Sequence, residues 1–189
     1  MDGILKFFYE MGQLKRVKRS GEWTAKVKEP YSVAEHIFRS AIVAYVLAKL
    51  EGADPEKTAM MALVHDIHEA RVNDMHKLGQ RYMDFRAAED NAFDEQTKQL
   101  PTEITQSING LRAEAKKDTS KEAIVARDAE LIEDALQAKE YIDIGYRDFK
   151  DWLANIRKTV RTKSAVRLLD LIEKTDSNCW WQNLKKIER

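Results

Sequence analysis

Two histidines and two aspartates occupy positions at which the hydrophobic pattern predicts burial: His36, His65, Asp66 and Asp128. His36, for example, falls on the same helical face as Val33. A buried carboxylate is unstable unless it is paired or bound to a metal ion. A single buried histidine is more often a hydrogen-bonded core residue than a ligand, but one divalent ion would satisfy all four groups. Together the four residues predict a metal site.

The predicted ligand set favours hydrolytic chemistry. Two imidazole nitrogens and two carboxylates are of intermediate hardness, which suits Mn, Co, Fe, Ni or Zn better than Ca. Four protein ligands on an octahedral ion leave about two positions for water or a substrate oxygen. The zinc-protease spacing H-E-x-x-H is absent, because Val72 stands where the second histidine would follow His68-Glu69.

Three further features could complete such a site. Glu69 lies one turn beyond His65, so its carboxylate can face the same site and orient or deprotonate a water molecule. Asp74 follows in a segment predicted to be irregular, where it either reaches over the metal or serves as a turn or cap residue. A basic cluster near the N-terminus forms a solvated surface or turns one arginine inward to pair with a phosphate: Lys15, Arg16, Lys18 and Arg19.

The composition argues against several classes of protein. The 189 residues contain 32 Lys and Arg against 32 Asp and Glu, a balance that disfavours a sequence-blind nucleic-acid binder. No stretch approaches the roughly 18 apolar residues of a membrane span, and the N-terminus does not read as a secretory signal. A single cysteine, Cys179, fits a reducing compartment. We therefore expect a cytoplasmic protein whose partners include neither a membrane nor a nucleic-acid polymer.

Residues that interrupt helices are scarce. The chain has 7 Gly and 3 Pro, where average usage gives about 13 and about 9. This scarcity predicts an all-α fold, which we expect to form one domain over residues 1–189. Capping patterns occur at Asp54-Pro55, at Ser32 with Glu35 and at Thr119 with Glu122. We expect irregular segments at 15–30 and 70–83, and helices near 2–14, 31–51, 55–69, 84–98, 101–117, 120–142, 146–159, 162–174 and 178–187.

The order of the four metal-binding candidates resembles the H…HD…D pattern of the HD-domain metal-dependent phosphohydrolases. Within that superfamily the sequence is most similar to the HD-domain 5′-deoxyribonucleotidases, over roughly residues 1–142. The motifs that carry the resemblance are Leu14-Lys15-Arg16-Val17, Ser32-Val33-Ala34-Glu35-His36, Ala62-Leu63-Val64-His65-Asp66, Glu69-Ala70, Asp74, and Asp128 with Leu136-Gln137-Ala138.

The resemblance implies an HD-domain helical bundle with a metal and substrate core at about 14–142 and additional C-terminal helices at about 143–189. It also implies hydrolysis of a small-molecule substrate, a (deoxy)nucleoside 5′-monophosphate, by a metal-activated water in a homodimer. Glu69 would position the water, Asp74 would assist catalysis or protonate the leaving oxygen, and Arg16 would hold the phosphate. One divalent ion (Mn, Co, Fe, Ni, Zn or Mg) would have four ligands: His36, His65, Asp66 and Asp128.

Two residues beside Arg16 differ from the family pattern. Val17 stands where bacterial members carry an aromatic residue that selects against a ribose 2′-hydroxyl, and Lys18 stands where the family often has proline. We expect both in the substrate-binding segment, and sugar selectivity stays open. Near the chain end, Trp180 and Trp181 are candidates for a dimer contact. Two alternative functions remain: an HD-fold hydrolase of another phosphate ester, such as a cyclic nucleotide or nucleotide triphosphate, and a non-catalytic metal- or nucleotide-binding protein.

Overall fold

Helices form the architecture, as the scarcity of glycine and proline predicts. The computed structural model describes residues 1–182 and 184, and these residues contain no strand, only an isolated bridge between Lys18 and Ser32. The all-α prediction is confirmed. Within the described residues no helix is long and apolar enough to cross a membrane. The elements are α1 (Asp2–Met11), the 3₁₀ turn η1 (Gly12–Lys15), α2 (Gly21–Thr24), α3 (Val33–Glu51), α4 (Pro55–Val64), α5 (Glu69–Val72), α6 (Lys77–Gln80), α7 (Phe85–Thr97), α8 (Thr102–Lys117), α9 (Lys121–Asp143), α10 (Phe149–Arg157), α11 (Lys163–Lys174) and α12 (Cys179–Gln182).

Side-chain caps fix the starts of α3, α4, α9 and α11. At the start of α3, the Ser32 hydroxyl accepts a hydrogen bond from the backbone N–H of Glu35, and the Glu35 carboxylate accepts one from the N–H of Ser32. The carboxylate of Asp54 caps α4 by accepting a hydrogen bond from the backbone N–H of Lys57. The start of α9 differs by one residue from the prediction, because the side chain of Ser120 rather than Thr119 caps the helix.

The main difference from the predicted helices lies after α4. The helix predicted over 55–69 ends at Val64, and a turn carries the chain into the short helix α5, which begins at Glu69. Asn73 then ends α5 with a φ of 62°, a left-handed value that asparagine adopts more readily than most residues. The break places the predicted metal ligands of this region in a turn rather than on a continuous helix.

Two segments predicted to be irregular contain short helices. The segment 15–30 holds α2, and the segment 70–83 holds α6 and the last turn of α5. The helix predicted over 178–187 begins as α12 at Cys179, and its second half falls largely outside the described residues.

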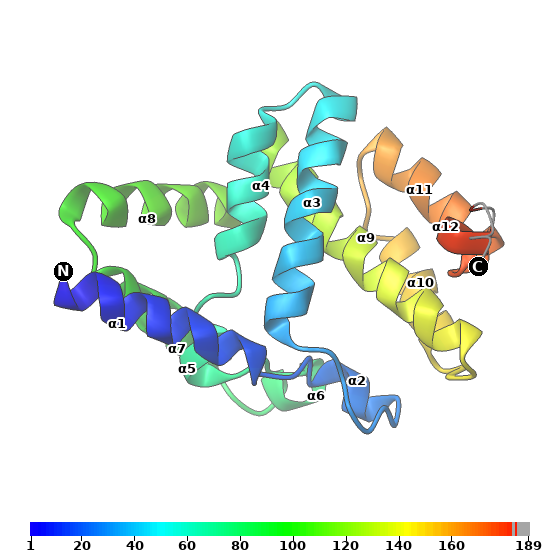
Figure 1. Ribbon diagram of the computed structural model, residues 1–189, viewed down its shortest axis with the longest axis horizontal. Coiled ribbons are helices and arrows are strands. Elements are labelled where there is room, and N and C mark those ends of the chain that lie inside the picture. The colour runs from blue at the N-terminus through cyan, green and yellow to red at the C-terminus, as the bar shows by residue number, and fades with distance from the viewer. Residues whose placement is uncertain (183, 185–189) are drawn as a thin grey trace, which may run out of the picture.

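Three helices form the centre of the molecule. α3 lies beside α4 and against α9, and α10 and α11 pack on α9 as well (Figure 1). These helices share a core that includes Leu47, Ile132 and Leu169. A second core, which includes Phe7 and Phe93, joins α1, η1, α7 and α8 to the ends of α3 and α4. The start of α3, the end of α4 and the middle of α9 therefore meet at one place.

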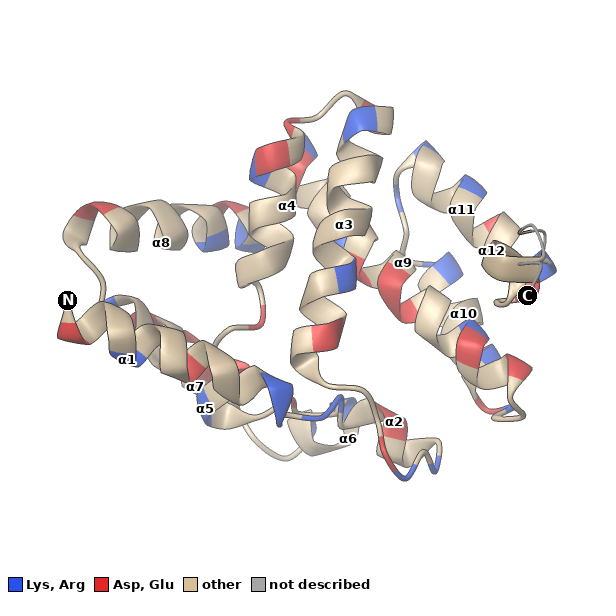
Figure 2. Cartoon of the chain, viewed as in Figure 1, with Lys and Arg blue, Asp and Glu red and all other residues tan. Residues whose placement is uncertain are grey.

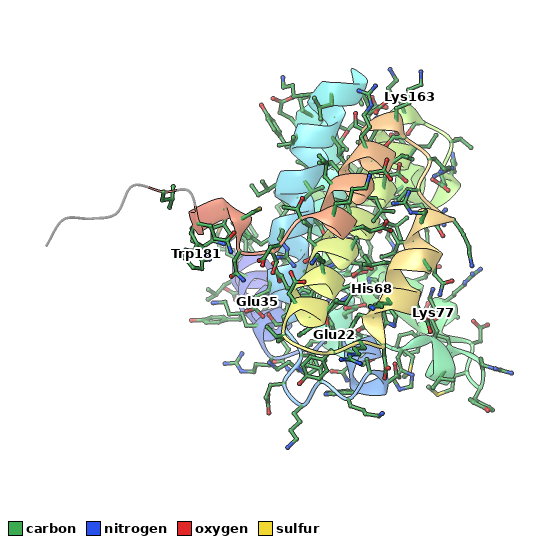
Figure 3. All side chains as sticks on the ribbon, turned by 90° about the vertical axis from the view of Figure 1, so that its right-hand side faces the viewer. Glu22, Glu35, His68, Lys77, Lys163 and Trp181 are labelled. Atoms are coloured by element: carbon green, nitrogen blue, oxygen red, sulfur yellow. The ribbon has the colours of Figure 1, made fainter. Side chains whose placement is uncertain are left out.

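A buried carboxylate ties α2 to α9. Glu22 (labelled in Figure 3) is 2% exposed. The hydroxyl of Tyr141 donates a hydrogen bond of 2.7 Å to Glu22 Oε2. Burial raises the pKa of Glu22 to about 8, although the Tyr141 hydrogen bond and the charge of Arg19 oppose the rise. In the folded protein Glu22 thus keeps its proton at pH values where the unfolded chain has lost it.

We predict that Glu22→Gln stabilises the protein increasingly as the pH rises. Below the unfolded pKa, close to 4.5, both forms of residue 22 are neutral. Between that value and about 8 only the unfolded wild type loses the proton, so its free energy of unfolding falls by about 1.4 kcal/mol per pH unit relative to the variant. Above about 8 the difference levels off. Urea denaturation of both proteins from pH 5 to pH 9 measures it, and a difference independent of pH would contradict the prediction.

Candidate metal and phosphate site

Three predicted metal ligands converge where α3, α4 and α9 meet. His36 lies in the first turn of α3, while His65 and Asp66 directly follow α4. The Nε2 atoms of the two histidines are 3.2 Å apart, and Asp66 Oδ2 lies 2.9 Å from His65 Nε2 and 3.9 Å from His36 Nε2. Ligand atoms held about 2.0–2.2 Å from one ion have separations of this size. The three side chains form one of the groups that could hold a metal ion.

The hydrogen bonds of the two imidazole rings direct Nε2 of each ring at the centre of this group. His65 Nδ1 lies 2.6 Å from the carbonyl oxygen of Ala62, which only accepts, so Nδ1 carries a proton. His36 Nδ1 likewise donates to the carboxylate of Glu133. In each ring Nε2 is therefore the atom available to a cation, the arrangement found in metal-binding histidines.

The electrostatic field at the group favours positive charge. Burial alone would lower the pKa of His65, but the carboxylates of Asp66 and Glu130 raise it to about 10. Arg19 pairs with Asp66 and Asp134, and Arg39 pairs with Glu133. A divalent cation therefore fits the donor set, which is rich in carboxylates: Asp66, Glu69, Asp74, Glu130, Glu133 and Asp134.

Glu133 orients the ring of His36 by its hydrogen bond with Nδ1. Its side chain is fully buried, and besides His36 it receives a 2.7 Å hydrogen bond from the Tyr31 hydroxyl and a 2.9 Å hydrogen bond from Arg39 Nε. Burial would raise the pKa of Glu133, but the hydrogen bond from His36 and the charge of Arg39 lower it. The carboxylate stays ionised and fixes the ring of His36, a role that the sequence pattern did not reveal.

The structure does not bring Asp128 to the histidines. Both carboxylate oxygens accept hydrogen bonds from the backbone N–H of Arg161, and one also accepts from Thr162 N at 2.6 Å. Asp128 is thus a buried residue whose charge is satisfied by the free N–H groups at the start of α11. The predicted role of Asp128 as fourth ligand is at odds with this geometry.

Other acids of α9 face the cluster instead. Glu130 Oε1 lies 3.9 Å from His65 Nδ1, and Asp134 Oδ1 lies 3.9 Å from His36 Nδ1. Figure 2 shows acidic residues grouped along the middle of α9, which packs against α3. Residues two apart on a helix point about 200° apart, so Glu130 points almost opposite to Asp128. Burial raises the pKa of Glu130, and the nearby charges of Asp66 and Asp134 raise it further.

Arg19 is the arginine that turns inward. Its guanidinium lies 3.4 Å from Asp66 and 3.1 Å from Asp134, and its side chain is 18% exposed. Burial would lower the pKa of Arg19, but Asp134, Asp74 and Asp66 are among the groups that raise it. Arg16, expected to hold the phosphate, is exposed and donates only to the carbonyl of Gly12. The inward arginine of the basic cluster is therefore Arg19.

Val17 and Lys18 also lie outside the cluster. Val17 is buried in the second core, and its carbonyl accepts a hydrogen bond from the N–H of Val33. Lys18 forms the isolated bridge with Ser32. Neighbouring residues of an extended segment point to opposite sides, so Lys18 points away from the side that Arg19 takes. Val17 shares the side of Arg19 but ends in the second core, whereas the longer side chain of Arg19 reaches Asp66 and Asp134.

Glu69 and Asp74, the expected catalytic residues, both lie beside the cluster. Glu69 is 6% exposed, and within the described structure its Oε2 has no hydrogen-bond partner. Burial and the nearby charges of Asp66 and Asp74 raise the pKa of Glu69 well above its usual range. Asp74 Oδ2 accepts a 2.6 Å hydrogen bond from Ser20 N, and burial raises its pKa too. Both carboxyl groups are thus disposed to hold a proton.

The two remaining histidines have structural partners. His68 Nδ1 accepts a 3.1 Å hydrogen bond from Arg112, which also donates to the carbonyl of His65. Since a guanidinium only donates, His68 carries its proton on Nε2, and Arg112 locks the turn that presents the ligands. His76 Nδ1 accepts from Gly79 N and caps α6.

A cavity of about 490 Å³ opens next to the cluster. Arg19, Asp74 and Asp134 line one part of it, and Trp152 and Ile156 of α10 line another. The C-terminal helices therefore contribute to the site, although the resemblance implied a substrate core that ends near residue 142.

The fold and the cluster together define an all-α protein with a His–Asp metal site. The sequence matches the HD domain family over residues 11–170, and the chain belongs to that family. Among curated relatives, 5′-deoxynucleotidase HDDC2 of Mus musculus is 32% identical over 143 residues, which cover 75% of this chain and 71% of the relative.

Two further similarities agree with this assignment. 5′-deoxynucleotidase HDDC2 of Dictyostelium discoideum is 34% identical over 150 residues, which cover 75% of this chain and 78% of the relative. A crystal structure of a protein from Pyrococcus horikoshii OT3 has a TM-score of 0.75 and 27% identity, and the match covers 90% of this chain and 96% of that one.

We predict opposite outcomes for two acids of α9. Asp128→Asn should lower the free energy of unfolding by about 1–3 kcal/mol, because N–H groups lose a buried charged acceptor, and should leave Mn²⁺ affinity unchanged. Glu130→Gln should weaken Mn²⁺ binding by at least about tenfold without destabilising the metal-free protein. Titration calorimetry with Mn²⁺ and urea denaturation of both variants measure the two effects. If Asp128→Asn lost Mn²⁺ binding while Glu130→Gln kept it, this prediction would be wrong and Asp128 would be the fourth ligand, as expected from the sequence.

Proposed function

We propose that the protein is a metal-dependent 5′-deoxynucleotidase, which hydrolyses deoxynucleoside 5′-monophosphates to deoxynucleosides and phosphate. The observation that carries the proposal is the convergence of His36 Nε2, His65 Nε2 and Asp66 Oδ2 beside the guanidinium of Arg19. The names of the relatives from Mus musculus and Dictyostelium discoideum support the same activity.

The residues that would hold the ion are His36, His65 and Asp66. We add Glu130 of α9 as the candidate fourth ligand, because its charge interacts with those of all three residues. When bound, a divalent ion polarises a phosphoryl oxygen and lowers the pKa of a coordinated water. The donor set suits Mn, Fe, Co, Ni, Zn or Mg, as expected from the sequence. Glu133 keeps the ring of His36 in register with the other ligands.

Arg19 would bind the phosphate of the substrate. Its two terminal nitrogens face Asp66 and Asp134, so the fork points into the site and is held there by charge. A phosphate oxygen placed beside Arg19 would lie next to the metal ligands as well. Arginine suits this role because its planar fork makes two parallel hydrogen bonds to phosphate.

Glu69 and Asp74 would move the protons. Glu69 Oε2 is buried without a hydrogen-bond partner among the described residues, and its raised pKa makes its ionised form a strong base for a proton of the attacking water. Asp74 lines the cavity on the side of Arg19, and its raised pKa favours the protonated form that can donate to the leaving 5′ oxygen. General acid–base help of this kind contributes about 10²–10⁴-fold to a rate.

Phosphate release from deoxy- and ribonucleoside 5′-monophosphates tests the proposal. We expect release only after Mn, Co, Mg or Zn is added to metal-free protein, and a higher rate with the deoxy series. Glu69→Gln should keep stoichiometric metal but lose at least about 100-fold in kcat. Arg19→Met should raise KM strongly, whereas the matched control Arg16→Met should behave as wild type, because Arg16 lies outside the site.

Three results would contradict the proposal. Absence of release with every metal, despite a bound ion, would point to a non-catalytic binding protein. Release from cyclic nucleotides or nucleotide triphosphates alone would assign another phosphate ester. Equal effects of Arg19→Met and Arg16→Met would remove Arg19 from phosphate binding.

We also propose that the enzyme is a cytoplasmic homodimer. The outward side of α3 exposes an apolar stripe with helical spacing that a second copy of the chain would cover: Phe38, Ile42, Tyr45 and Val46. Trp181 stands at the edge of the molecule on α12 (Figure 3), and Trp180 beside it is 74% exposed. Sedimentation at micromolar concentration should show a dimer that Ile42→Glu converts to monomer. A monomeric wild type would contradict the proposal.

A further inference from the structure

The cavity beside the cluster, here called the chamber, has two chemically different parts. Arg19, Asp74 and Asp134 form a charged part, and Arg19 connects it to the His–Asp cluster through its ion pair with Asp66. Trp152 and Ile156 of α10, together with Leu131 of α9, form an apolar part. A volume of about 490 Å³ exceeds what a phosphate group fills and is typical of a small-molecule site.

Trp152 is the aromatic residue of the chamber, and its ring is held firmly on two sides. A Cβ atom added to Gly21 would lie 3.0 Å from Trp152 Cη2, so the indole rests directly on the backbone that follows Arg19. The ring of Phe149 packs against the indole with centroids 4.9 Å apart and an angle of 61° between the planes. Trp152 remains partly exposed and lines the chamber.

Gly21 has a definite part in this arrangement. Its missing side chain allows Trp152 to approach the segment that carries Arg19, two residues earlier in the chain. Any larger residue would push the indole toward the chamber or away from the segment. The backbone contact at Gly21 thus places the indole relative to the segment that carries Arg19, while Asp66 and Asp134 hold the guanidinium itself.

Polar groups accompany the aromatic wall. Asn155 and Thr159 follow Trp152 on and just after α10 and line the chamber with it. A side-chain amide supplies a donor and an acceptor in one plane, which matches the edge of a heterocyclic base. An aromatic face with an amide nearby is a combination that suits a planar ring bearing hydrogen-bonding groups.

We propose that the apolar part of the chamber binds the heterocyclic base of the nucleotide, with Trp152 as the stacking wall and Gly21 as the residue that admits it. The inference rests on the proposed function for the phosphate end and adds the site of the base. A ligand with its phosphate at Arg19 extends along the chamber toward Trp152, because both residues line the same cavity.

The test compares two substrates that differ only in the base. Deoxyribose 5-phosphate has the sugar and phosphate of a deoxynucleotide but no base. Trp152→Leu should raise KM for deoxynucleoside 5′-monophosphates at least tenfold and change KM for deoxyribose 5-phosphate less than twofold. Trp152→Phe, which keeps an aromatic face, should recover most of the loss. Gly21→Ala should resemble Trp152→Leu, because it displaces the same ring.

The control is Trp23→Leu. Trp23 lies on α2 next to Glu22 but is half exposed and is absent from the lining of the chamber. It should behave as wild type with both substrates. Equal losses of Trp152→Leu on both substrates, or no loss on either, would overturn the assignment of the base site.

A binding measurement separates this inference from the proposed function. Calorimetry with deoxynucleosides, which carry no phosphate, requires no hydrolysis. Wild type and Trp23→Leu should bind a deoxynucleoside at least tenfold more tightly than Trp152→Leu. If the wild type hydrolyses no nucleotide but still shows this pattern, the base site stands and only the activity fails. If no deoxynucleoside binds, or if all three proteins bind equally, the base site is refuted.

Discussion

Repulsion among buried carboxylates is the constraint on which the site depends. Asp66, Glu69 and Asp74 lie together at the end of α4 and in the turns after it, and acids of α9 face them from the other side. Charges interact more strongly as water is excluded, so such a group requires cations nearby. Arg19 supplies one from the N-terminal segment. Both imidazole rings donate from Nδ1 to oxygen atoms outside the cluster, so both Nε2 atoms face its centre, where a metal cation could bind.

The surrounding helices hold the acids, the cavity walls and the turn after α4 in place. α9 contributes acids from one side, and its opposite side carries Asp128, which holds the start of α11. α11 and α10 then pack against α9, and α10 carries Trp152 to the chamber. The helices that position His36, His65 and Asp66 therefore also position the walls of the cavity. Arg112 connects α8 to the turn after α4, so even a distant helix restrains the ligands.

The sequence was sufficient to predict the all-α fold, most helices and the convergence of His36, His65 and Asp66, because helical periodicity reveals polar residues on apolar faces. It was insufficient for Asp128, since burial of an acid does not say whether a metal or backbone N–H groups neutralise it. The choice between Arg16 and Arg19 depended on tertiary contacts: Arg16 ends η1 and its side chain bonds back to Gly12, whereas Arg19 follows the Lys18–Ser32 bridge and reaches Asp66. The contact between Gly21 and Trp152 joins segments that are far apart in the sequence, so no local sequence pattern predicts it.

The most direct test of the central claim is a crystal structure of the Mn²⁺-loaded protein, with the ion located by its anomalous scattering. The account predicts one peak within bonding distance of His36 Nε2, His65 Nε2 and Asp66, with Glu130 on the same side and the guanidinium of Arg19 next to it. Asp128 should keep its hydrogen bonds to the start of α11. A peak bound by Asp128, or one remote from the two histidines, would contradict the account.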